Sequence, residues 1–454
     1  VNYDYSGKYL LEVAFREDRS AKFYTDNRWG FFPSVSAGWR ISEESFIKDR
    51  TSIMDNLKFR LSYGKMGDDK GNNNEVRAFQ YLTGYNYPGN SSYILGSNVI
   101  KSIDSKGLPN LAYTWFTSEI YNTGVDVSLW NRLLETSVDV FYRKRKGLLA
   151  YRYLSLPNTF GSTLPQENLN SDDYRGFELT LGHTNQIQNF WYSIKGNVSF
   201  TRIKNVYIEQ ADPVNSYRYW KDFRSDRWQN IEYGYKYVGQ FRDQDEINNW
   251  AVQDGAGNTT LSPGDLKFED FNGDGIINEY DEQPIGRGNK PEIYFGLDLS
   301  ANWKEFDLSI LMQGATNYTR YLYNTMETSL FNGASSLDIF MDRWHKADLY
   351  NSNSEWIPGK YPSTYSSGKP SNLRRSTFNV IDSYYLRVKN IELGYTFSKH
   401  KTQRYGISDL RIFVSGNNVL TFDNLPFGDP EAPSSDAILY PQLRIWNIGI
   451  NLTF

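Results

Sequence analysis

The sequence lacks three features that would place it in a common protein class: cysteine, long apolar runs, and a strong excess of one charge. No cysteine occurs in its 454 residues, which excludes disulfides, thiol nucleophiles and cysteine-based metal sites. No run of about 18 apolar residues occurs, so membrane-spanning helices are excluded. With 49 basic and 53 acidic residues the formal charge is −4, and we therefore expect no nucleic-acid partner.

Aromatic residues and strict alternation are abundant instead. Aromatics make up 16% of the chain, and 35 residues are Tyr. In the final stretch, WNIGINLTF, every second residue from Trp446 to Phe454 is apolar, and the residues between are Asn, Gly or Thr. The same period of two occurs in KYLLEVAFR (8–16), YNTGVDVSLW (121–130), EIYFGLDLSANW (292–303) and FDLSILMQ (306–313). One face of each strand suits lipid and the other suits water.

This pattern predicts an all-β fold, a transmembrane antiparallel β-barrel with long extracellular loops. Mean hydropathy is low, at −0.61, but this does not exclude a barrel, because only half of the residues of each barrel strand face lipid. Aromatics near the strand ends, such as Tyr121, Trp130, Trp303 and Phe306, are typical of the girdles at the two membrane interfaces. We expect about twelve strands, at 3–17, 31–41, 56–66, 113–130, 133–147, 173–184, 190–203, 292–303, 305–314, 381–397, 409–419 and 443–454.

The connections between these strands alternate between short and long. Short ones lie at 132–135, 184–189 and 304–305, and long ones at 148–172, 204–291, 315–380 and 420–442. Since outer-membrane barrels have short periplasmic turns and long external loops, we expect every long loop outside the cell. The strand at 381–397 changes phase between Val388 and Ile391. Either a bulge near Lys389 and Asn390 restores a single lipid face, or the strand begins only at Ile391.

Six stretches, in this order along the chain, resemble the SusC/RagA-type TonB-dependent outer-membrane transporters. They are RWGFFPSVSAGWRISEESF (28–46), LKFRLSYGKMGD (57–68), YRGFELTLG (174–182), GDLKFEDFNGDGIINEYDEQPIG (264–286), YYLRVKNIELGYTF (384–397) and the final Phe454. The resemblance implies that residues 1–454 are the C-terminal portion of a 22-stranded barrel. The N-terminal plug and the first strands would precede this chain, and its start at Val1, with no initiator Met or signal segment, fits a piece of a longer polypeptide.

The resemblance also implies a function. The chain would import oligosaccharides or peptides across the outer membrane of a Gram-negative bacterium, with a SusD-like surface lipoprotein as a lid and with TonB acting through the missing N-terminal part. Two barrels with two lids would pair into a dimer. The alternative is a barrel that serves as a structural subunit of a larger outer-membrane assembly without import. The external segment DRWHKADLYNSNSEWIPGKYP (342–362) departs from the family pattern, so we expect it to be specialised.

The segment DFNGDGIINEYD follows a calcium-loop pattern. The predicted oxygen ligands, in order of loop position, are Asp270, Asn272, Asp274, the carbonyl of Ile276, Asn278 and Asp281. The last is a shorter carboxylate than the usual Glu, so modest affinity is expected. Since no flanking helix pair is evident, we predict a structural Ca²⁺ that orders an external loop. The alternative is an Asn-Gly, Asp-Gly turn that binds no ion.

Other polar and aromatic clusters have weaker interpretations. The segment SYRYWKDFRSDRWQN (216–230), with Trp250, Trp344 and Trp356, could stack on substrate, but packing within loops or against the lid is favoured, and we assign no substrate-binding residue. The basic run Arg143, Lys144, Arg145 and Lys146 lies at the external end of its strand; it either contacts outer-membrane lipid and lipopolysaccharide or forms a solvated rim.

Catalysis is not expected. The sequence has three histidines, His183, His345 and His400, which are far apart, and no Gly-x-Ser-x-Gly or His-Glu-x-x-His motif. An outer-membrane hydrolase would need one of them to meet a nucleophile, and we predict that this protein is not an enzyme.

Overall fold

The computed structural model describes the chain except for residues 71–78, 90–91, 154–158, 160–161, 163, 323–325, 366–368 and 433–441. It divides into two compact units, which are described separately. The first contains residues 1–184 and 197–229, and the second contains residues 185–196 and 230–454.

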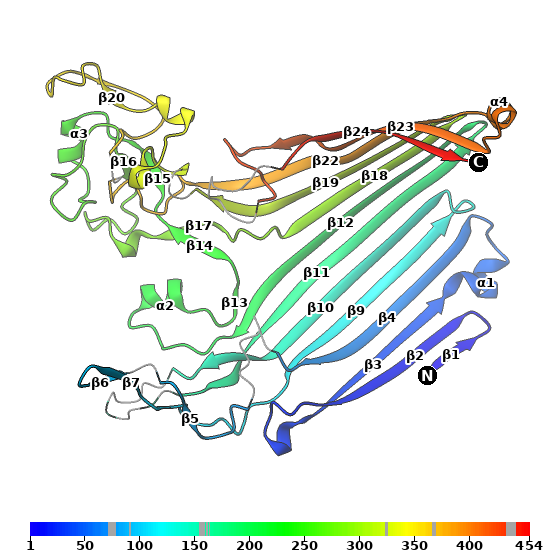
Figure 1. Cartoon of the computed structure of the whole chain (residues 1–454), viewed down its shortest axis with the longest axis horizontal. Coiled ribbons are helices and arrows are strands. Elements are labelled where there is room, and N and C mark those ends of the chain that lie inside the picture. The colour runs from blue at the N-terminus through cyan, green and yellow to red at the C-terminus, as the bar shows by residue number, and fades with distance from the viewer. Residues whose placement is uncertain are drawn as a thin grey trace. The chain divides into compact units, whose positions relative to one another are not determined.

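The first unit is built on an antiparallel sheet of long strands (Figure 1). Its strands are β1 (Asn2–Tyr5), β2 (Tyr9–Arg19), β3 (Trp29–Arg40), β4 (Met54–Asp68), β9 (Phe116–Leu129), β10 (Leu134–Tyr151), β11 (Gln166–Ile187) and β12 (Phe190–Tyr207). They pair in this order. The turn end of β11 and the beginning of β12, residues 185–196, belong to the second unit.

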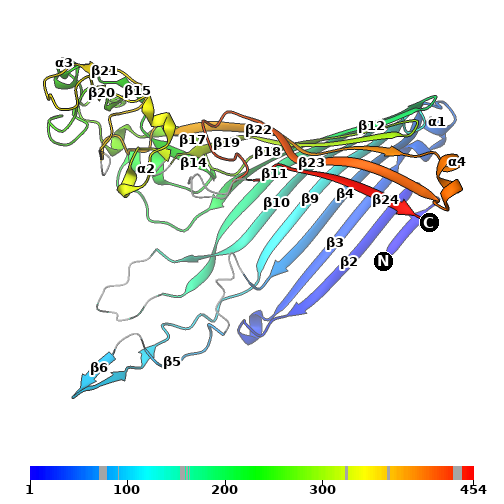
Figure 2. The same cartoon turned by 45° about the horizontal axis from the view of Figure 1, so that its top comes forward.

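Smaller elements fill the connections of the first unit. They are η1 (Thr25–Asn27), η2 (Ile41–Glu43), α1 (Ser45–Lys48), β5 (Tyr85–Asn86), β6 (Ser92–Leu95), β7 (Asn98–Lys101), β8 (Asp104–Ser105), α2 (Ser216–Asp222) and β13 (Arg227–Trp228). β5 pairs with β8, β6 with β7, and β13 with β12. Figure 2 shows the β6–β7 hairpin extending well beyond the ends of β4 and β9. The long connections therefore gather at one end of the strands and the short turns at the other.

The second unit has an antiparallel sheet of the same kind. Its strands, in pairing order, are β18 (Ile293–Trp303), β19 (Phe306–Tyr321), β22 (Val380–Thr396), β23 (Asp409–Asp423) and β24 (Ile445–Thr453). The connections hold β14 (Ile231–Gly234), β15 (Tyr237–Gln240), α3 (Gln244–Asn248), β16 (Leu266–Phe268), η5 (Glu279–Asp281), β17 (Gln283–Arg287), η7 (Phe331–Gly333), η8 (Asp338–Met341), β20 (His345–Lys346), β21 (Trp356–Ile357), α4 (Lys399–Thr402) and η9 (Gln403–Tyr405).

The predicted strands are present, with one correction. The first predicted strand, 3–17, is wrong as a single strand, because β1 and β2 form a hairpin around Ser6 and Gly7. Both residues have positive φ, 54° and 66°, and Asp4 accepts a hydrogen bond from the Gly7 N–H at 2.7 Å. The loop between the paired Tyr5 and Tyr9 has three residues, and the Lys8 N–H donates to the Tyr5 carbonyl at 3.0 Å. Alternation continues through such a turn, so it does not reveal the reversal.

Of the two alternatives for the strand at 381–397, the structure shows the bulge. β22 runs from Val380 to Thr396, and in its pairing with β19 the neighbours Met312 and Leu311 lie opposite Val388 and Asn390, which leaves Lys389 without a counterpart. Lys389 is therefore the extra residue, and β22 does not begin at Ile391. Val388 faces Met312 of β19 while Ile391 faces Ile310, so a single apolar face continues through the bulge.

The external part of the second unit has a small core of its own. Phe241, Ile247 and Leu261 form one buried cluster, and Leu266, Phe268 and Ile277 form another. Trp250 packs against both clusters, and its indole N–H donates to the Phe268 carbonyl at 3.1 Å. The segment that carries the predicted calcium loop is thus folded. Within the described residues, no helix is both long enough and apolar enough to span a membrane.

Candidate functional site

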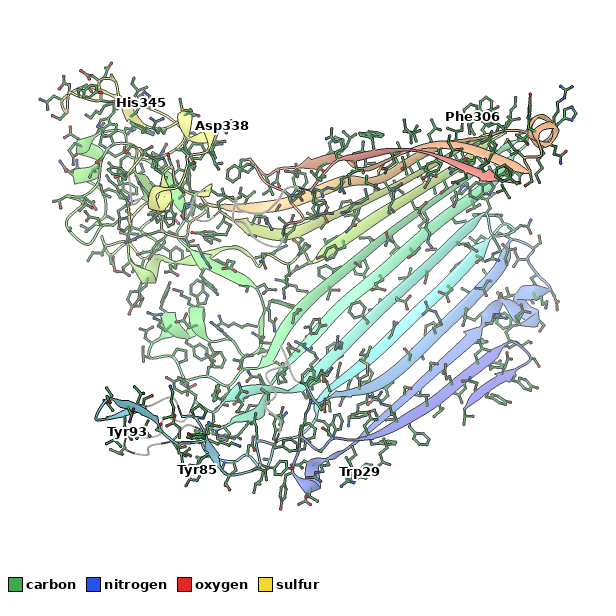
Figure 3. The ribbon with its side chains drawn as sticks, viewed as in Figure 1. Trp29, Tyr85, Tyr93, Phe306, Asp338 and His345 are labelled. Atoms are coloured by element: carbon green, nitrogen blue, oxygen red, sulfur yellow. The ribbon has the colours of Figure 1, made fainter. Side chains whose placement is uncertain are left out.

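The two faces of the sheets differ as the alternation predicts. On the apolar face, aromatic side chains cluster at both ends of the strands. Tyr9 stacks on Trp39 at the turn end of the first unit, and Phe306 lies 4.9 Å from Tyr395, ring to ring, at the turn end of the second. Figure 3 shows Phe306 at the turn end of β19 and Trp29 at the loop end of β3. The strands therefore carry an apolar band between two aromatic rows.

The polar face of the first unit carries an arginine held by two carboxylates. Arg60 on β4 donates Nε and Nη2 to Asp126, both at 2.8 Å, and Nη1 and Nη2 to Asp139, at 3.0 and 2.8 Å. Arg60 lies directly opposite Gly124 on β9, and Gly124 lies opposite Asp139 on β10. Since Gly124 has no side chain, the guanidinium can cross β9 and reach the second strand along.

The second unit repeats this arrangement with different residues. Arg411 on β23 binds Asp307 on β19 and Glu392 on β22, with 3.0 Å from Nε to Asp307 and 2.6 Å from Nη2 to Glu392. Gly394 on β22 lies opposite Asp307, and a Cβ there would lie 2.5 Å from the Arg411 Nη2. Sequence reasoning missed both networks. The signal was available only in part, since opposite charges on polar positions of neighbouring strands identify partners only once the register is known.

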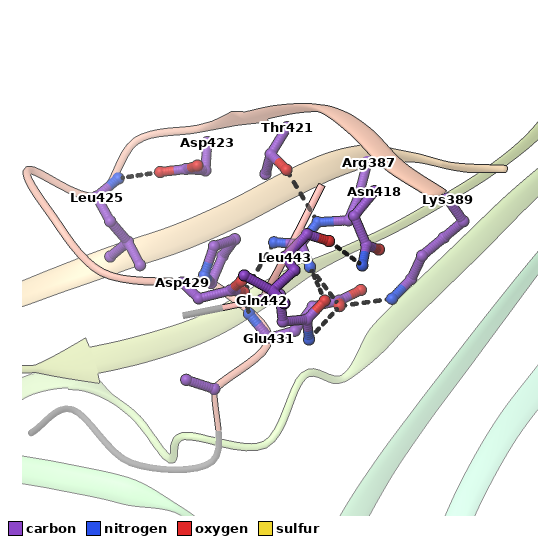
Figure 4. A network of polar contacts seen from close by, with 12 residues as sticks. Arg387, Lys389, Asn418, Thr421, Asp423, Leu425, Asp429, Glu431, Gln442 and Leu443 are labelled. Atoms are coloured by element: carbon purple, nitrogen blue, oxygen red, sulfur yellow. Dashed lines mark hydrogen bonds and ion pairs between the residues drawn. The ribbon is translucent and has the colours of Figure 1, made fainter. Parts of the chain in front are cut away.

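A third inward-facing arginine fixes a loop. Arg387 on β22 is almost fully buried and binds Asp429 at 2.8 Å, Glu431 at 2.7 Å and the Thr421 hydroxyl at 2.9 Å (Figure 4). Lys389, the bulged residue, donates to the same Glu431 at 2.6 Å. The bulge thus places a second cation on the polar face, and the two together hold the described residues of the loop after β23 against the sheet.

The predicted calcium loop adopts a compact turn with hydrogen bonds at regular intervals. Asp270 accepts from the Gly273 and Gly275 N–H groups, both at 2.8 Å. Asn272 accepts from Asp274 N–H at 3.0 Å, and Asp274 accepts from Ile276 N–H at 2.8 Å. These bonds orient the side chains at loop positions 1, 3 and 5. Each oxygen keeps further acceptor capacity, and the donor set, oxygens throughout, suits Ca²⁺.

The last predicted ligand, Asp281, also has a structural role. It is fully buried and accepts the N–H groups of Phe271, at 2.9 Å, and Asn278, at 2.8 Å, which ties the two ends of the loop together. Among the described residues, no three Asp, Glu or His side chains gather as a metal-ligand cluster. Since the predicted set relies on two Asn side chains and one carbonyl as well, calcium binding stays a prediction.

Two external carboxyl groups have shifted pKa values of opposite sign. Partial burial acts to raise the pKa of Asp254, but hydrogen bonds from Thr260, Ala256 and Asn258 outweigh it and lower the pKa to about 2. Burial raises the pKa of Glu327 to about 8, although a hydrogen bond with Tyr321 acts against the rise. Glu327 accepts from the buried Asn379 amide at 2.5 Å and has no cation within salt-bridge distance among the described residues. Neither carboxyl was singled out by its sequence context.

The predicted external aromatics pack within the loops. Tyr219 stacks on Phe223 at 4.5 Å, and Arg227 donates to the Tyr219 and Trp220 carbonyls. Trp344 is buried, and its indole N–H donates to Gln240 at 3.1 Å. Trp356 lies under the Lys346 ammonium at 4.6 Å, within the predicted specialised segment 342–362. These contacts are those of loop packing.

The histidines do not form a catalytic arrangement with the contacts described. His345 Nδ1 lies 2.9 Å from the carbonyl of Arg343, two residues away, and a backbone carbonyl is not a nucleophile. His183 on β11 pairs with Leu134 at the turn end of β10, and His400 lies in α4. The three therefore occupy separate elements.

The predicted basic run divides between the two faces of β10. Arg143 donates to Ser118 at 2.7 Å, and Arg145 donates Nε to the buried Asp172 at 2.7 Å, both on the polar face. Lys144 and Lys146 lie in the opposite phase, with Tyr142 and Val140. The run is therefore not a single basic patch, since Arg143 and Arg145 bind Ser118 and Asp172 on the polar face.

Comparison with known proteins assigns the chain to a family. Residues 1–262 match the family model described as TonB dependent receptor-like, beta-barrel. This chain belongs to that family. The sheets described above are therefore the wall of a TonB-dependent receptor barrel, with the polar face toward the lumen, and the predicted all-β barrel fold and SusC-type resemblance are confirmed. The family is one of outer-membrane receptors and not of enzymes.

Relatives and solved structures agree with this assignment. The chain is 27% identical to TonB-dependent receptor P3 of Formosa agariphila and 25% identical to TonB-dependent receptor SusC of Bacteroides thetaiotaomicron, over its full length. It covers 45% and 43% of those relatives, so it spans somewhat less than half of their length. The structure of the RagAB peptide importer in its "open-open" state matches with a TM-score of 0.74 at 19% identity, over 100% of this chain and 46% of that one. This last likeness shows the fold.

Proposed function

We propose that the full protein imports a nutrient, an oligosaccharide or a peptide, across the outer membrane. The observation that carries the proposal is membership of the TonB-dependent receptor barrel family, together with a wall whose polar face is rich in charged side chains. A lipid-sealed wall with a polar lumen suits the passage of a hydrophilic solute. Support for an importer comes from the solved RagAB peptide transporter, whose fold is similar, and from the relative named SusC.

The proposed partners follow from the same relatives. A SusD-like surface lipoprotein would cover the external loops, and TonB would act through an N-terminal part of the full-length protein. The strands would cross the outer membrane of a Gram-negative bacterium as a multi-pass barrel, with two barrel and lid pairs forming a dimer. The proposed assembly is tested by affinity purification of the full-length protein from outer membranes, with the lipoprotein expected at one copy per barrel.

Uptake measurement tests the import itself. Cells that carry the full-length protein and its lipoprotein are supplied with labelled peptide or oligosaccharide mixtures, in a host with TonB and in one without. We expect accumulation of one substrate class and its loss without TonB. If neither class accumulates while the protein is folded in the outer membrane, import is contradicted and the structural-subunit alternative is favoured.

We also propose that the loop 270–281 binds a structural Ca²⁺. Support comes from its pattern of oxygen side chains and from the turn hydrogen bonds that orient Asp270, Asn272 and Asp274. The test is calorimetric titration of the full-length protein with calcium, for the parent, for Asp274→Ala, and for the control Asp245→Ala in helix α3. Heat at micromolar to millimolar calcium is expected for the parent and the control. No heat from the parent at millimolar calcium contradicts the site.

A further inference from the structure

The apolar face of the first unit carries a row of tyrosines toward the loop ends of its strands, and a row of charged residues follows it. Tyr63 on β4, Tyr121 on β9 and Tyr142 on β10 lie directly opposite one another, with ring centroids 5.1 and 6.3 Å apart. The next residues of the same phase toward the loops are Lys65, Glu119 and Lys144, also opposite one another. The change from aromatic to charged residues is therefore sharp and occurs at the same level on three strands.

The row continues across β11 and β12 with arginines stacked on rings. Arg175 on β11 lies opposite Tyr142, with its guanidinium 5.6 Å from that ring and 5.8 Å from the Trp228 ring. The Arg202 guanidinium on β12 lies 4.4 Å from the centre of the same Trp228 ring. Lys204 pairs with Trp228 across the β12–β13 ladder. We define the basic belt as Lys65, Lys144, Lys146, Arg175, Arg202 and Lys204.

The basic belt has an excess of positive charge. Three acids share its face: Glu119, which pairs with Lys146 at 3.3 Å, Asp173, which pairs with Arg175 at 2.9 Å, and Asp226, which pairs with Lys204 at 2.5 Å. Six cations and three acids leave a net charge of 6 − 3 = +3. Arg175 and Lys146 keep about half of their side-chain surface exposed, at 49% and 48%. These two side chains are therefore accessible from outside although each is paired with an acid, and the belt cations with no acid within salt-bridge distance among the described residues include Lys65 and Lys144.

The level of the belt determines what it can meet. Below the tyrosines the same face is apolar, as at Phe59 and Val125, which lie opposite one another. Tyr at such a boundary lies in the interface between hydrocarbon and headgroups. Strand residues rise about 3.3 Å each, so side chains two positions beyond the tyrosines reach the layer of headgroup phosphates. At this level the ammonium groups of Lys65 and Lys144 can meet phosphate as point charges, whereas Arg175 already donates Nε and Nη2 to Asp173, at 3.1 and 2.9 Å.

We propose that the basic belt binds the phosphorylated headgroups of outer-leaflet glycolipids. The occupant is chosen by charge complementarity and by continuity with the apolar face below, which a water-soluble protein partner would not share. The proposal rests on the outer-membrane placement in the proposed function. It goes further by assigning the lipid class and the residues, and by excluding Arg143 and Arg145, which face the lumen.

The test compares lipid binding by two variants of equal charge change. The belt variant is Lys65→Gln, Lys144→Gln, Lys146→Gln, and the control is Lys70→Gln, Lys101→Gln, Lys106→Gln in the external loops of the same unit. The full-length protein is titrated in detergent with a bisphosphorylated lipid A-type glycolipid and with its dephosphorylated form. Since a basic residue at a charged membrane surface contributes measurably to binding, we expect about tenfold or more weaker binding by the belt variant only, and a salt dependence that this variant loses.

The outcomes separate this proposal from the proposed function. If the folded belt variant binds the phosphorylated glycolipid as tightly as the control does, the proposed binding by the belt is contradicted. It is also contradicted if the parent binds the phosphorylated and dephosphorylated forms equally. Loss of a co-purified protein instead of lipid also overturns it, because the belt is then a protein interface. These results leave uptake untouched, whereas a parent absent from the outer-membrane fraction overturns the placement on which both proposals rest.

Discussion

Arg60 in the first unit and Arg387 in the second are both inward-facing arginines bound by two carboxylates, but their partners differ in origin. Asp126 lies on the strand next to that of Arg60 and Asp139 on the second strand along, and the Arg60 side chain keeps 31% of its surface exposed. Asp429 and Glu431 come from the loop after β23, and Arg387 keeps only 3%. In the first case the strand ladders hold the charges together. In the second the charges hold the loop.

This difference has an energetic consequence. An exposed ion pair between groups already placed by strands contributes little, because water screens the attraction. Removing one member of a buried pair leaves carboxylates without a partner away from water, which is costly. Similar arginine networks therefore stabilise different parts of the molecule. The Arg60 network adds little to strands that are already paired, whereas the Arg387 network is required for the loop after β23 to pack on the sheet.

The largest expected effect is that of Arg387→Met. It leaves Asp429 and Glu431, whose side chains are only 17% and 11% exposed, without their main cation, so we expect the loop to lose about 3 to 5 kcal/mol of stability against opening. Limited proteolysis of the folded barrel measures this as faster cleavage within 424–432. Arg60→Met, at the exposed network, is the matched control and is expected to cost about 1 kcal/mol or less. Equal effects of the two substitutions would contradict the comparison.

A half-buried carboxyl without a cation completes the comparison. Burial raises the pKa of Glu327 from the ordinary 4.5 to about 8, so the folded protein holds a proton there that the unfolded chain releases. The stability that this proton supports is complete below pH 4.5 and is lost as the pH rises through about 8. Glu327→Gln removes this loss, and we expect it to stabilise the protein on the order of 3 kcal/mol at pH 8 and hardly at all at pH 4.

The measurement for Glu327→Gln is the thermal unfolding midpoint as a function of pH. The exposed Glu355→Gln serves as the control and should leave the pH profile of the parent unchanged. A parallel shift of the Glu327→Gln curve at every pH would show that the carboxyl is not the titrating group.

A smaller effect is expected where the Arg60 network crosses β9. A Cβ at Gly124 would lie 2.5 Å from Asp139 Oδ1 and 2.7 Å from Arg60 Nη2, so Gly124→Ala must displace the pair, at about 1 to 3 kcal/mol. Gly64→Ala on β4 is the control, because its Cβ would meet only the Ser34 Cβ, at 3.8 Å. Heat-modified gel mobility reports unfolding of each variant. If Gly124→Ala melts like Gly64→Ala, the crossing is not sterically tight.

The smallest effect concerns a carboxylate held by backbone and not by arginine. Hydrogen bonds lower the pKa of Asp254 to about 2, so its stabilisation is present above the ordinary pKa of 3.8 and is lost as the pH falls through about 2. Because the carboxylate is partly exposed, we expect Asp254→Asn to cost only about 1 kcal/mol at pH 7. Hydrogen exchange of Thr260 N–H measures the change, and Asp243→Asn controls for loss of charge. Unchanged protection at Thr260 would contradict the assignment.

Alternation predicted the walls well because a lipid or water neighbour acts on each residue separately. Twelve segments required no knowledge of pairing. The phase change at Val388 left a bulge and a later strand start as alternatives, and the pairing of β22 with β19 shows the bulge, at Lys389. The hairpin at Ser6 and Gly7 was missed for the same reason. Its two strands keep the alternation, and only the positive φ values mark the reversal.

The charged residues show where such reasoning ends. In the run at 143–146, the sequence suggested one patch, whereas alternate members face the lumen and the headgroup level. The sequence by itself determined which residues face oil and which face water, since that choice depends on period alone. Which inward charge meets which, and which outward cations gather above the tyrosines, was decided by strand register and loop folding, because these bring together residues that lie far apart along the chain.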